Sequence, residues 1–183
     1  MNEHTSLVRG RASTAGDRGV ADATGHRGIA SATGHRGIAS ASGIWGAATA
    51  TGYRGSASAS GYRGVASATS ESGAADATGA WGAAIAVGHM ATASATGHCG
   101  AAVVTGDYSA VSASGAHSIA LADGRLSKAR GSLGCGLTLV ERDPHDGALL
   151  GIVSVIVGLT YDGVTIQPGV FYALSCGKIV KLG

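Results

Sequence analysis

A glycine recurs every nine residues through most of this chain, and that period constrains the fold more than any other feature. The recurring positions are Gly16, Gly25, Gly34, Gly43, Gly52, Gly61, Gly79, Gly88, Gly97, Gly106, Gly115 and Gly124, with Ser70 in the one remaining place. The unit reads G-x-x-G-x-A-x-A-[ST], as in residues 25–33. A fixed short period is typical of a solenoid, in which each unit buries its apolar face only against its neighbours.

The alanines of the unit indicate which side of each strand is buried. The sixth and eighth positions are nearly always alanine, as at Ala30 and Ala32, and a spacing of two places both on one face of a strand. We therefore expect the alanine face inside and the two glycines of G-x-x-G in turns. A helical fold is disfavoured, because each interior glycine would cost about 1 kcal/mol relative to alanine.

The third position of the unit indicates how many units make one coil. One set recurs every 18 residues: Arg27, Trp45, Arg63 and Trp81. With two units per coil this set stacks on one edge as a ladder in which each guanidinium lies against an indole. A second set stacks on the opposite edge: Arg18, Arg36 and Arg54. Three units per coil would separate the tryptophans, so we predict an all-β protein, a parallel β-solenoid with two nine-residue strand-turn units per coil.

Composition divides the chain into three segments. Residues 1–6 are a polar lead-in, residues 7–132 carry the repeats, and residues 133–183 are richer in Val, Ile and Leu. Turn signals in the last segment separate expected strands at 135–142, 149–158, 163–167, 170–175 and 178–182. We expect a small β domain that caps the solenoid, since an open coil exposes unpaired backbone groups. The same domain is also a candidate for oligomerisation.

An interior of alanine and glycine buries little apolar area against the entropy lost on ordering the chain. Outward aliphatic side chains could supply more burial through self-association: Val20, Ile29, Ile38, Val65, Ile85, Val87, Val103 and Leu121. The alternative is that they are scattered surface aliphatics, which are common. We favour a homo-oligomer.

The repeats resemble those of two known families. The unit is similar to the nonapeptide G-G-x-G-x-D-x-U-x of calcium-binding β-rolls, but the aspartate that binds calcium there is alanine here, as at Ala21, Ala30 and Ala39. Residues 106–124, GDYSAVSASGAHSIALADG, resemble the head repeats of trimeric autotransporter adhesins, which implies a trimer that binds surfaces. The chain as a whole resembles uncharacterised bacterial and phage solenoid proteins with G-x-x-S-A-A-S-A-T units.

Two kinds of side-chain row are candidate binding sites. The arginine rows would attract an anionic ligand or glycan, or would simply extend into solvent. Outward hydroxyl pairs would form a flat array of the kind found in ice-binding proteins, or a plain structural face: Ser31/Thr33, Thr49/Thr51, Ser67/Thr69 and Ser94/Thr96.

Catalysis, metal binding and a cofactor are not expected. His26, His35, His89 and His98 share the second position of the unit, but no two of them are adjacent in an 18-residue coil. No catalytic triad or paired carboxylates are apparent. Cys99, Cys135 and Cys176 lack the spacing of a disulfide framework and are expected to be reduced.

The expected location is the cytoplasm or a virion. The N-terminal residues show no apolar signal-peptide region, and the longest apolar run, 148–159, falls short of the ~20 residues of a spanning helix. We expect a non-catalytic, self-associating rigid spacer or surface-binding protein of a phage or bacterial assembly, with a trimer favoured. The alternatives are a module that sequesters an anionic ligand through its Arg/Trp edges, and an ice-binding protein.

Overall fold

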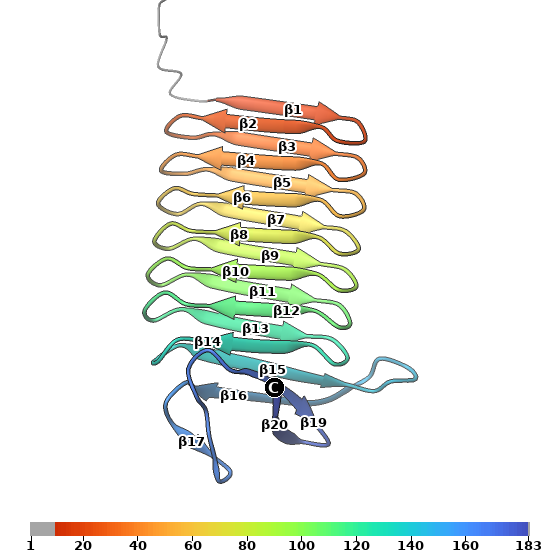
Figure 1. Cartoon of the computed structure of the whole chain (residues 1–183), viewed down its shortest axis with the longest axis vertical. Coiled ribbons are helices and arrows are strands. Elements are labelled where there is room, and N and C mark those ends of the chain that lie inside the picture. The colour runs from red at the N-terminus through yellow and green to blue at the C-terminus, as the bar shows by residue number, and fades with distance from the viewer. Residues whose placement is uncertain (1–9, 183) are drawn as a thin grey trace, which may run out of the picture.

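Two long sheets lie against each other in the computed structural model, which describes residues 10–182 (Figure 1). Sheet A contains β1 (Arg11–Ala15), β3 (Ile29–Thr33), β5 (Ala47–Thr51), β7 (Val65–Thr69), β9 (Ala83–Val87), β11 (Ala101–Thr105), β13 (Ile119–Asp123), β15 (Gly136–Arg142) and β16 (Leu149–Ile156). Sheet B contains β2 (Val20–Thr24), β4 (Ile38–Ser42), β6 (Ser56–Ala59), β8 (Ala74–Ala77), β10 (Thr92–Ala95), β12 (Ala110–Ala113), β14 (Lys128–Gly131), β19 (Phe171–Ser175) and β20 (Lys178–Leu182). We call their outer surfaces face A and face B.

The strand register confirms the 18-residue coil. Each of the strands from β1 to β13 pairs in parallel with the strand one coil further on, so that Ile29 lies opposite Ala47 and Ala30 opposite Ala48. The strands β1–β14 make seven coils, and the residues described contain no helix. The predicted parallel β-solenoid with two units per coil is therefore confirmed. The polar lead-in at 1–6 and the beginning of the first unit lie outside the described residues.

The interior is as narrow as the sequence predicts. Ala30 and Ala32 are 1% and 0% exposed, and alanines fill the corresponding places along the rod, with Val104 and Val111 as the larger exceptions. Glycine is required where the turns of successive coils meet, because a Cβ added to Gly61 would collide with the carbonyl oxygen of Gly43. In the column of Gly43, Gly61 and Gly79 the coils can therefore stack at strand spacing only without side chains, whereas Ser70 fits in the column on the opposite side of the rod.

Buried hydroxyl groups replace glycine at the fourth position of the last coils. The hydroxyl of Ser109 accepts a hydrogen bond from the N–H of Ala91 (3.1 Å) and donates one to the carbonyl oxygen of Gly88 (3.1 Å). Ser118 and Ser127 make the corresponding contacts to the coil before them. The buried thiol of Cys135 takes the same place in the next turn. These bridges join successive coils through side chains as well as through the strand ladders.

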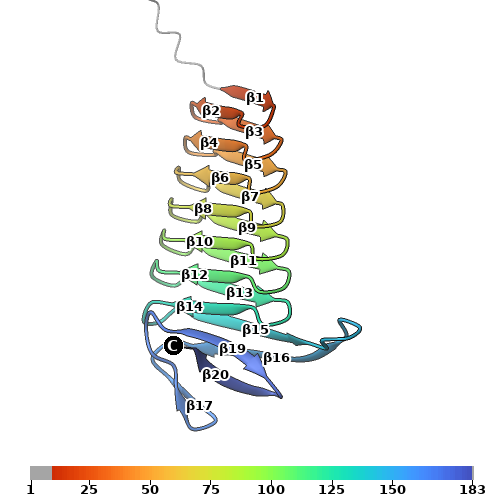
Figure 2. The same cartoon turned by 45° about the vertical axis from the view of Figure 1, so that its right-hand side comes forward.

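The C-terminal strands extend both sheets and change their direction. β15 pairs in parallel with β13 and antiparallel with β16, while β19 pairs antiparallel with β14 and with β20 (Figure 2). Here the interior changes from alanine to large side chains, since Leu137, Leu139 and Tyr172 are at most 1% exposed. The small C-terminal β cap expected from the sequence is confirmed, and its strands β16, β19 and β20 pair antiparallel. The expected strand at 163–167 is shorter, because β18 (Val164–Thr165) forms only a two-stranded hairpin with β17 (Thr160–Tyr161).

A charged pair joins the cap to the last coil of sheet A. The guanidinium of Arg142 donates hydrogen bonds to both carboxylate oxygens of Asp123, with Nη2 2.8 Å from Oδ2. This hydrogen bonding, together with the negative charge of Asp123, raises the pKa of Arg142. Glu141 accepts a hydrogen bond from the N–H of Gly177 (2.8 Å), which fixes the turn between β19 and β20.

The narrow interior predicts a strong contrast between adjacent residues of β5. Ala48→Leu adds three carbons where the residue is 1% exposed, and we expect it to lower the free energy of unfolding by about 1–3 kcal/mol. Ala47→Leu makes the same change on the outer surface and should have little effect. Chemical denaturation followed by circular dichroism measures both, and equal losses would contradict the packing of the two sheets.

The serine bridges predict a second contrast. Ser109→Ala removes the acceptor of the buried Ala91 N–H, and we expect it to cost about 1–3 kcal/mol of stability. Ser114→Ala provides the control, because Ser114 directly follows β12 and its side chain is exposed on face B. Thermal unfolding of the two variants checks the difference, and a neutral Ser109→Ala would show that water or a shifted backbone replaces the bridge.

Candidate functional site

The turns form two edges that run along the rod. Edge 1 comprises the turns at 16–19, 34–37, 52–55, 70–73, 88–91, 106–109 and 124–127, which lead from sheet A to sheet B. Edge 2 comprises the turns at 25–28, 43–46, 61–64, 79–82, 97–100 and 115–118, which lead back. As predicted, Arg27, Trp45, Arg63 and Trp81 lie together on edge 2, and Arg18, Arg36 and Arg54 on edge 1. Their role in ligand binding stays a prediction.

The expected Arg/Trp ladder is wrong in part. The guanidinium carbon of Arg63 lies 4.8 Å from the ring centroid of Trp45 and 5.6 Å from that of Tyr62. No other arginine lies over a tryptophan in the part of the chain that the structure describes. One guanidinium cannot cover both of its neighbours, and Arg63 is directed toward Trp45, so Trp81 keeps a free indole.

A reversed turn peptide explains why the ladder is irregular. The N–H of Trp45 donates to the carbonyl oxygen of His26 in the preceding coil, whereas the N–H of Arg63 donates to that of Ala80 in the following coil. Arg63 and Trp81 have left-handed backbones with φ of 58° and 60°, a conformation that Trp45 does not share. The side chains therefore leave the backbone in different directions on successive coils, a change that the repeated sequence motif did not indicate.

Left-handed third positions are common on both edges, and nearly all of them carry side chains. They are Arg36, Arg54, Arg63, Ser72, Trp81, Met90, Cys99, Tyr108, His117 and Leu126, with φ between 53° and 61°. Glycine would adopt this conformation without steric cost, yet it takes the third position only in the last turn, at Gly134 with φ of 80°. The turns thus keep side chains where the backbone would favour glycine.

The two edges differ in charge. The turns of edge 1 include Asp17, Glu71 and Asp107, and Arg125 lies 3.4 Å from the Asp107 carboxylate. The turns of edge 2 contain no aspartate or glutamate, while they carry Arg27 and Arg63. The arginines of edge 2 therefore have no acidic residue in any turn of the same edge.

Histidines and aromatic rings make further contacts at the edges. His35 stacks on Tyr53 with ring centroids 5.1 Å apart, and His98 meets His117 edge to face at 5.3 Å. Sequence reasoning missed the second pair, because His117 occupies the third position of its unit and His98 the second. Among residues 10–182, no group of three or more His, Cys, Asp or Glu side chains is placed to hold a metal ion.

Exposed aliphatic side chains gather on the C-terminal half of face A, and we call this patch the aliphatic region of face A. It consists of the outward side chains Ile85, Val87, Val103, Ile119, Leu121, Ile152 and Ile156 on β9, β11, β13 and β16. Ile85, Val103 and Leu121 follow one another on adjacent strands. Ile119 and Ile152 are 53% and 57% exposed, so large apolar surface meets solvent here.

Face B carries a column of hydroxyl groups beside edge 2, while the predicted outward aliphatics Val20 and Ile38 are exposed at the other ends of its first strands. Its column beside edge 2 contains Thr24, Ser42, Ser60, Thr78, Thr96 and Ser114, all of them exposed. Of the hydroxyl pairs expected to form one array, Ser31/Thr33, Thr49/Thr51 and Ser67/Thr69 lie on face A, whereas Ser94/Thr96 lies on face B. The ice-binding alternative stays a prediction, with the hydroxyl pairs divided between the two faces.

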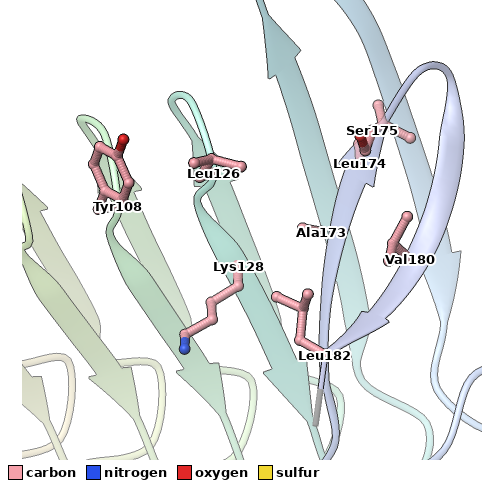
Figure 3. A pocket seen from close by; sticks show the side chains of 8 residues that line it. All are labelled: Tyr108, Leu126, Lys128, Ala173, Leu174, Ser175, Val180 and Leu182. Atoms are coloured by element: carbon pink, nitrogen blue, oxygen red, sulfur yellow. The ribbon is translucent and has the colours of Figure 1, made fainter.

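A groove of about 420 Å³ lies where the last coil meets the cap. Tyr108 and Leu126 line it from edge 1, Lys128 from β14, and five residues from β19 and β20 (Figure 3). The ammonium of Lys128 lies 4.8 Å from the Phe171 ring centroid, and the guanidinium of Arg130 lies 4.6 Å from it. The sequence could not indicate this groove, because β14 and the β19–β20 hairpin are far apart in the chain and share no repeat.

No family model, curated protein or solved structure matches this chain. None of the structure between residues 10 and 182 is a helix with the length and apolarity needed to cross a membrane.

The carboxyl of Asp76 makes stability depend on pH. Asp76 stands on face B between Ser58 and Ser94, and partial withdrawal from water raises its pKa above the ordinary value near 3.8. The folded state then binds more protons than the unfolded state in that range, so stability falls as pH rises through it. We expect Asp76→Ser to stabilise the fold at neutral pH by a few tenths of a kcal/mol, the range for exposed substitutions, and to bring no gain below the ordinary aspartate pKa.

Urea denaturation at several pH values measures this effect. Asp22→Ser removes the same charge from β2 in the same column and controls for net charge. A gain from Asp76→Ser that persists in acid would show that the cause is packing and not ionisation.

Proposed function

We propose that this protein is a non-catalytic structural rod that self-associates through face A. The observation that carries the proposal is the segregation of outward side chains. The coils that present Ile85, Val103 and Leu121 on face A present Asp76, Ser94 and Ser112 at the corresponding places on face B. In the N-terminal coils exposed aliphatics lie on both faces, with Val20 and Ile38 on face B and Ile29 on face A, whereas in these later coils they gather on face A, as expected of a docking face.

The interior supports the need for this extra burial. An alanine methyl contributes little apolar area, and at about 25 cal/mol per Å² the core offsets only part of the ordering cost of about 1–2 kcal/mol per residue. Large buried side chains such as Leu137 and Tyr172 are confined to the cap. Burial of the aliphatic region of face A would add stabilisation along the seven coils, where the core is thinnest.

The area of face A fits a second copy of the chain. Nine strands spaced about 4.8 Å apart, each about 13 Å long, give a face of roughly 560 Å². Two copies that meet through this face therefore bury roughly 1,100 Å² in total. A specific interface needs about 1,000 Å², which the aliphatic region alone does not reach. The two rods therefore lie parallel and cover the whole face, because only this arrangement places aliphatic against aliphatic side chains.

The number of copies follows from how face A is covered. A flat face that complements itself forms a pair around a two-fold axis, with sheets about 10 Å apart. The trimer implied by the resemblance to adhesin heads would place face A of each copy against an edge of the next.

A role as rigid spacer or surface-binding element in a phage particle or bacterial assembly rests on the resemblance of the repeats to solenoids of that kind.

Charge placed within the aliphatic region tests the proposal. We expect the wild-type chain to show a multiple of its 17.7 kDa mass by size exclusion with light scattering at micromolar concentration. Val103→Lys combined with Leu121→Lys places two ammonium groups on adjacent strands of face A and should yield monomers. Ser94→Lys combined with Ser112→Lys adds the same charges on adjacent strands of face B and should leave the mass unchanged. A monomeric wild-type chain, or equal dissociation of the two variants, would overturn the proposal.

A further inference from the structure

We propose that the N-terminal half of edge 2 binds a linear acidic polysaccharide whose chain runs along the rod. The site is the strip formed by Arg27, Trp45, Arg63 and Trp81 on four successive coils, together with the hydroxyl column of face B beside it. Trp81 lies in the turn before β9, so the strip is on an edge of the rod, whereas the proposed pairing covers the outer surface of sheet A. The inference does not rest on the proposed function.

Exposed aromatic rings supply the surfaces on which sugar rings stack. Trp45 is 44% exposed, Tyr62 47% and Trp81 54%, although large aromatic side chains are usually buried. The C–H groups on one side of a pyranose ring form an apolar face that packs on an indole. Both tryptophans of the chain lie on this edge and project from turns between strands, where a long ligand can reach them.

Cations without acidic partners supply the attraction for negative charge. Edge 2 has no aspartate or glutamate in its turns, and the two ion pairs of the described residues, Arg125 with Asp107 and Arg142 with Asp123, are at the C-terminal end. The guanidinium of Arg63 rests on Trp45 and Tyr62, which holds it in place while its N–H groups stay available to a carboxylate.

The spacing of the strip favours a polysaccharide over a nucleic acid. Arg27 and Arg63 are two coils apart, as are Trp45 and Trp81, and two coils span about 10 Å. A nucleic acid strand carries a phosphate about every 3.4 Å, far denser than these cations, and the edge is convex where single-strand binders use a basic groove. A chain in which an acidic sugar alternates with a neutral one presents charge and an uncharged ring in turn, at a period comparable to two coils.

Hydroxyl groups line the strip on one side. Thr24 and Ser42 end β2 and β4 on face B, Ser60 and Thr78 directly follow β6 and β8, and each of the four directly precedes a turn of edge 2. Each coil thus offers one exposed hydroxyl beside one arginine or tryptophan. Hydroxyls act both as donors and as acceptors, which suits the many hydroxyls of a sugar chain.

The backbone of the strip indicates that its side chains are retained at a cost. Arg63 and Trp81 hold left-handed φ values of 58° and 60°, a region that disfavours every residue type with a side chain and least suits bulky ones. Glycine, abundant in every turn, would remove that strain. Third positions on both edges share this conformation, so the exposed aromatic rings and the cations, and not the backbone, distinguish the strip.

Tryptophan fluorescence tests the inference on the full chain, because both indoles lie on the strip. The probe is a size-defined hyaluronan oligosaccharide, in which glucuronate alternates with N-acetylglucosamine. We expect it to change the emission of the wild-type protein at low salt and to bind more weakly as salt rises. Chitin oligosaccharides, which lack the carboxylate, should bind at least about tenfold more weakly, as expected for loss of a charge-assisted hydrogen bond.

Matched variants locate the site by calorimetry. Arg63→Gln and Trp81→Ala should each weaken hyaluronan binding about tenfold. Arg54→Gln and Tyr53→Ala, which alter a comparable arginine–aromatic contact on edge 1, should change it less than about twofold; circular dichroism verifies that all four fold. Three results would overturn the inference: no hyaluronan binding at low salt, equal losses on the two edges, or tighter binding of oligothymidylate than of hyaluronan.

Discussion

The narrow separation of the two sheets is the constraint on which the rest of the structure depends. Little more than methyl groups fits between them, as the full burial of Ala50 and Ala68 shows, with Val104 and Val111 as the largest side chains inside the coils. Glycine at nearly every recurring turn position lets the turns of successive coils approach. The interior therefore leaves no room for variation, and nearly all the diversity of the chain is directed outward. Faces and edges carry whatever specificity this protein has, while the interior supplies regularity.

Side-chain bridges and the cap compensate for the thin interior at one end of the rod. The hydroxyls of Ser109, Ser118 and Ser127 bind the preceding coil in the region where the aliphatic side chains of face A begin to dominate. Beyond them Leu137 and Leu139 form a larger apolar core, and Arg142 joins Asp123. Stability along the rod is consequently uneven, since contacts in a repeat structure are made only between neighbours.

The fold could be predicted from the sequence because the same pattern of glycine and alanine recurs every nine residues along most of the chain. The alternation at Ala30 and Ala32 defines the buried side, and the recurrence of Trp45 and Trp81 defines the length of the coil. Contacts between side chains on neighbouring coils could not be predicted in the same way. The Arg63–Trp45 contact depends on a reversal of one turn peptide, which nothing in the G-x-x-G motif signals. The groove at the cap depends on β14 meeting a hairpin about 40 residues later, outside any repeat.

The parallel register has a consequence for how such a chain can change its length. From β1 to β14, residue i lies opposite residue i+18, so an insertion or deletion of 18 residues in this part adds or removes one full layer and leaves every downstream residue on its original surface. A change of nine residues preserves the sequence motif but transfers everything downstream to the opposite side of the molecule. The hydroxyl groups of face B would then lie next to the aliphatic side chains of face A in one column. The turns of edge 2, with their tryptophans, would stack on the turns of edge 1, which carry both acidic and basic residues. Gene duplication or loss can therefore extend or shorten this architecture freely only in steps of two repeats.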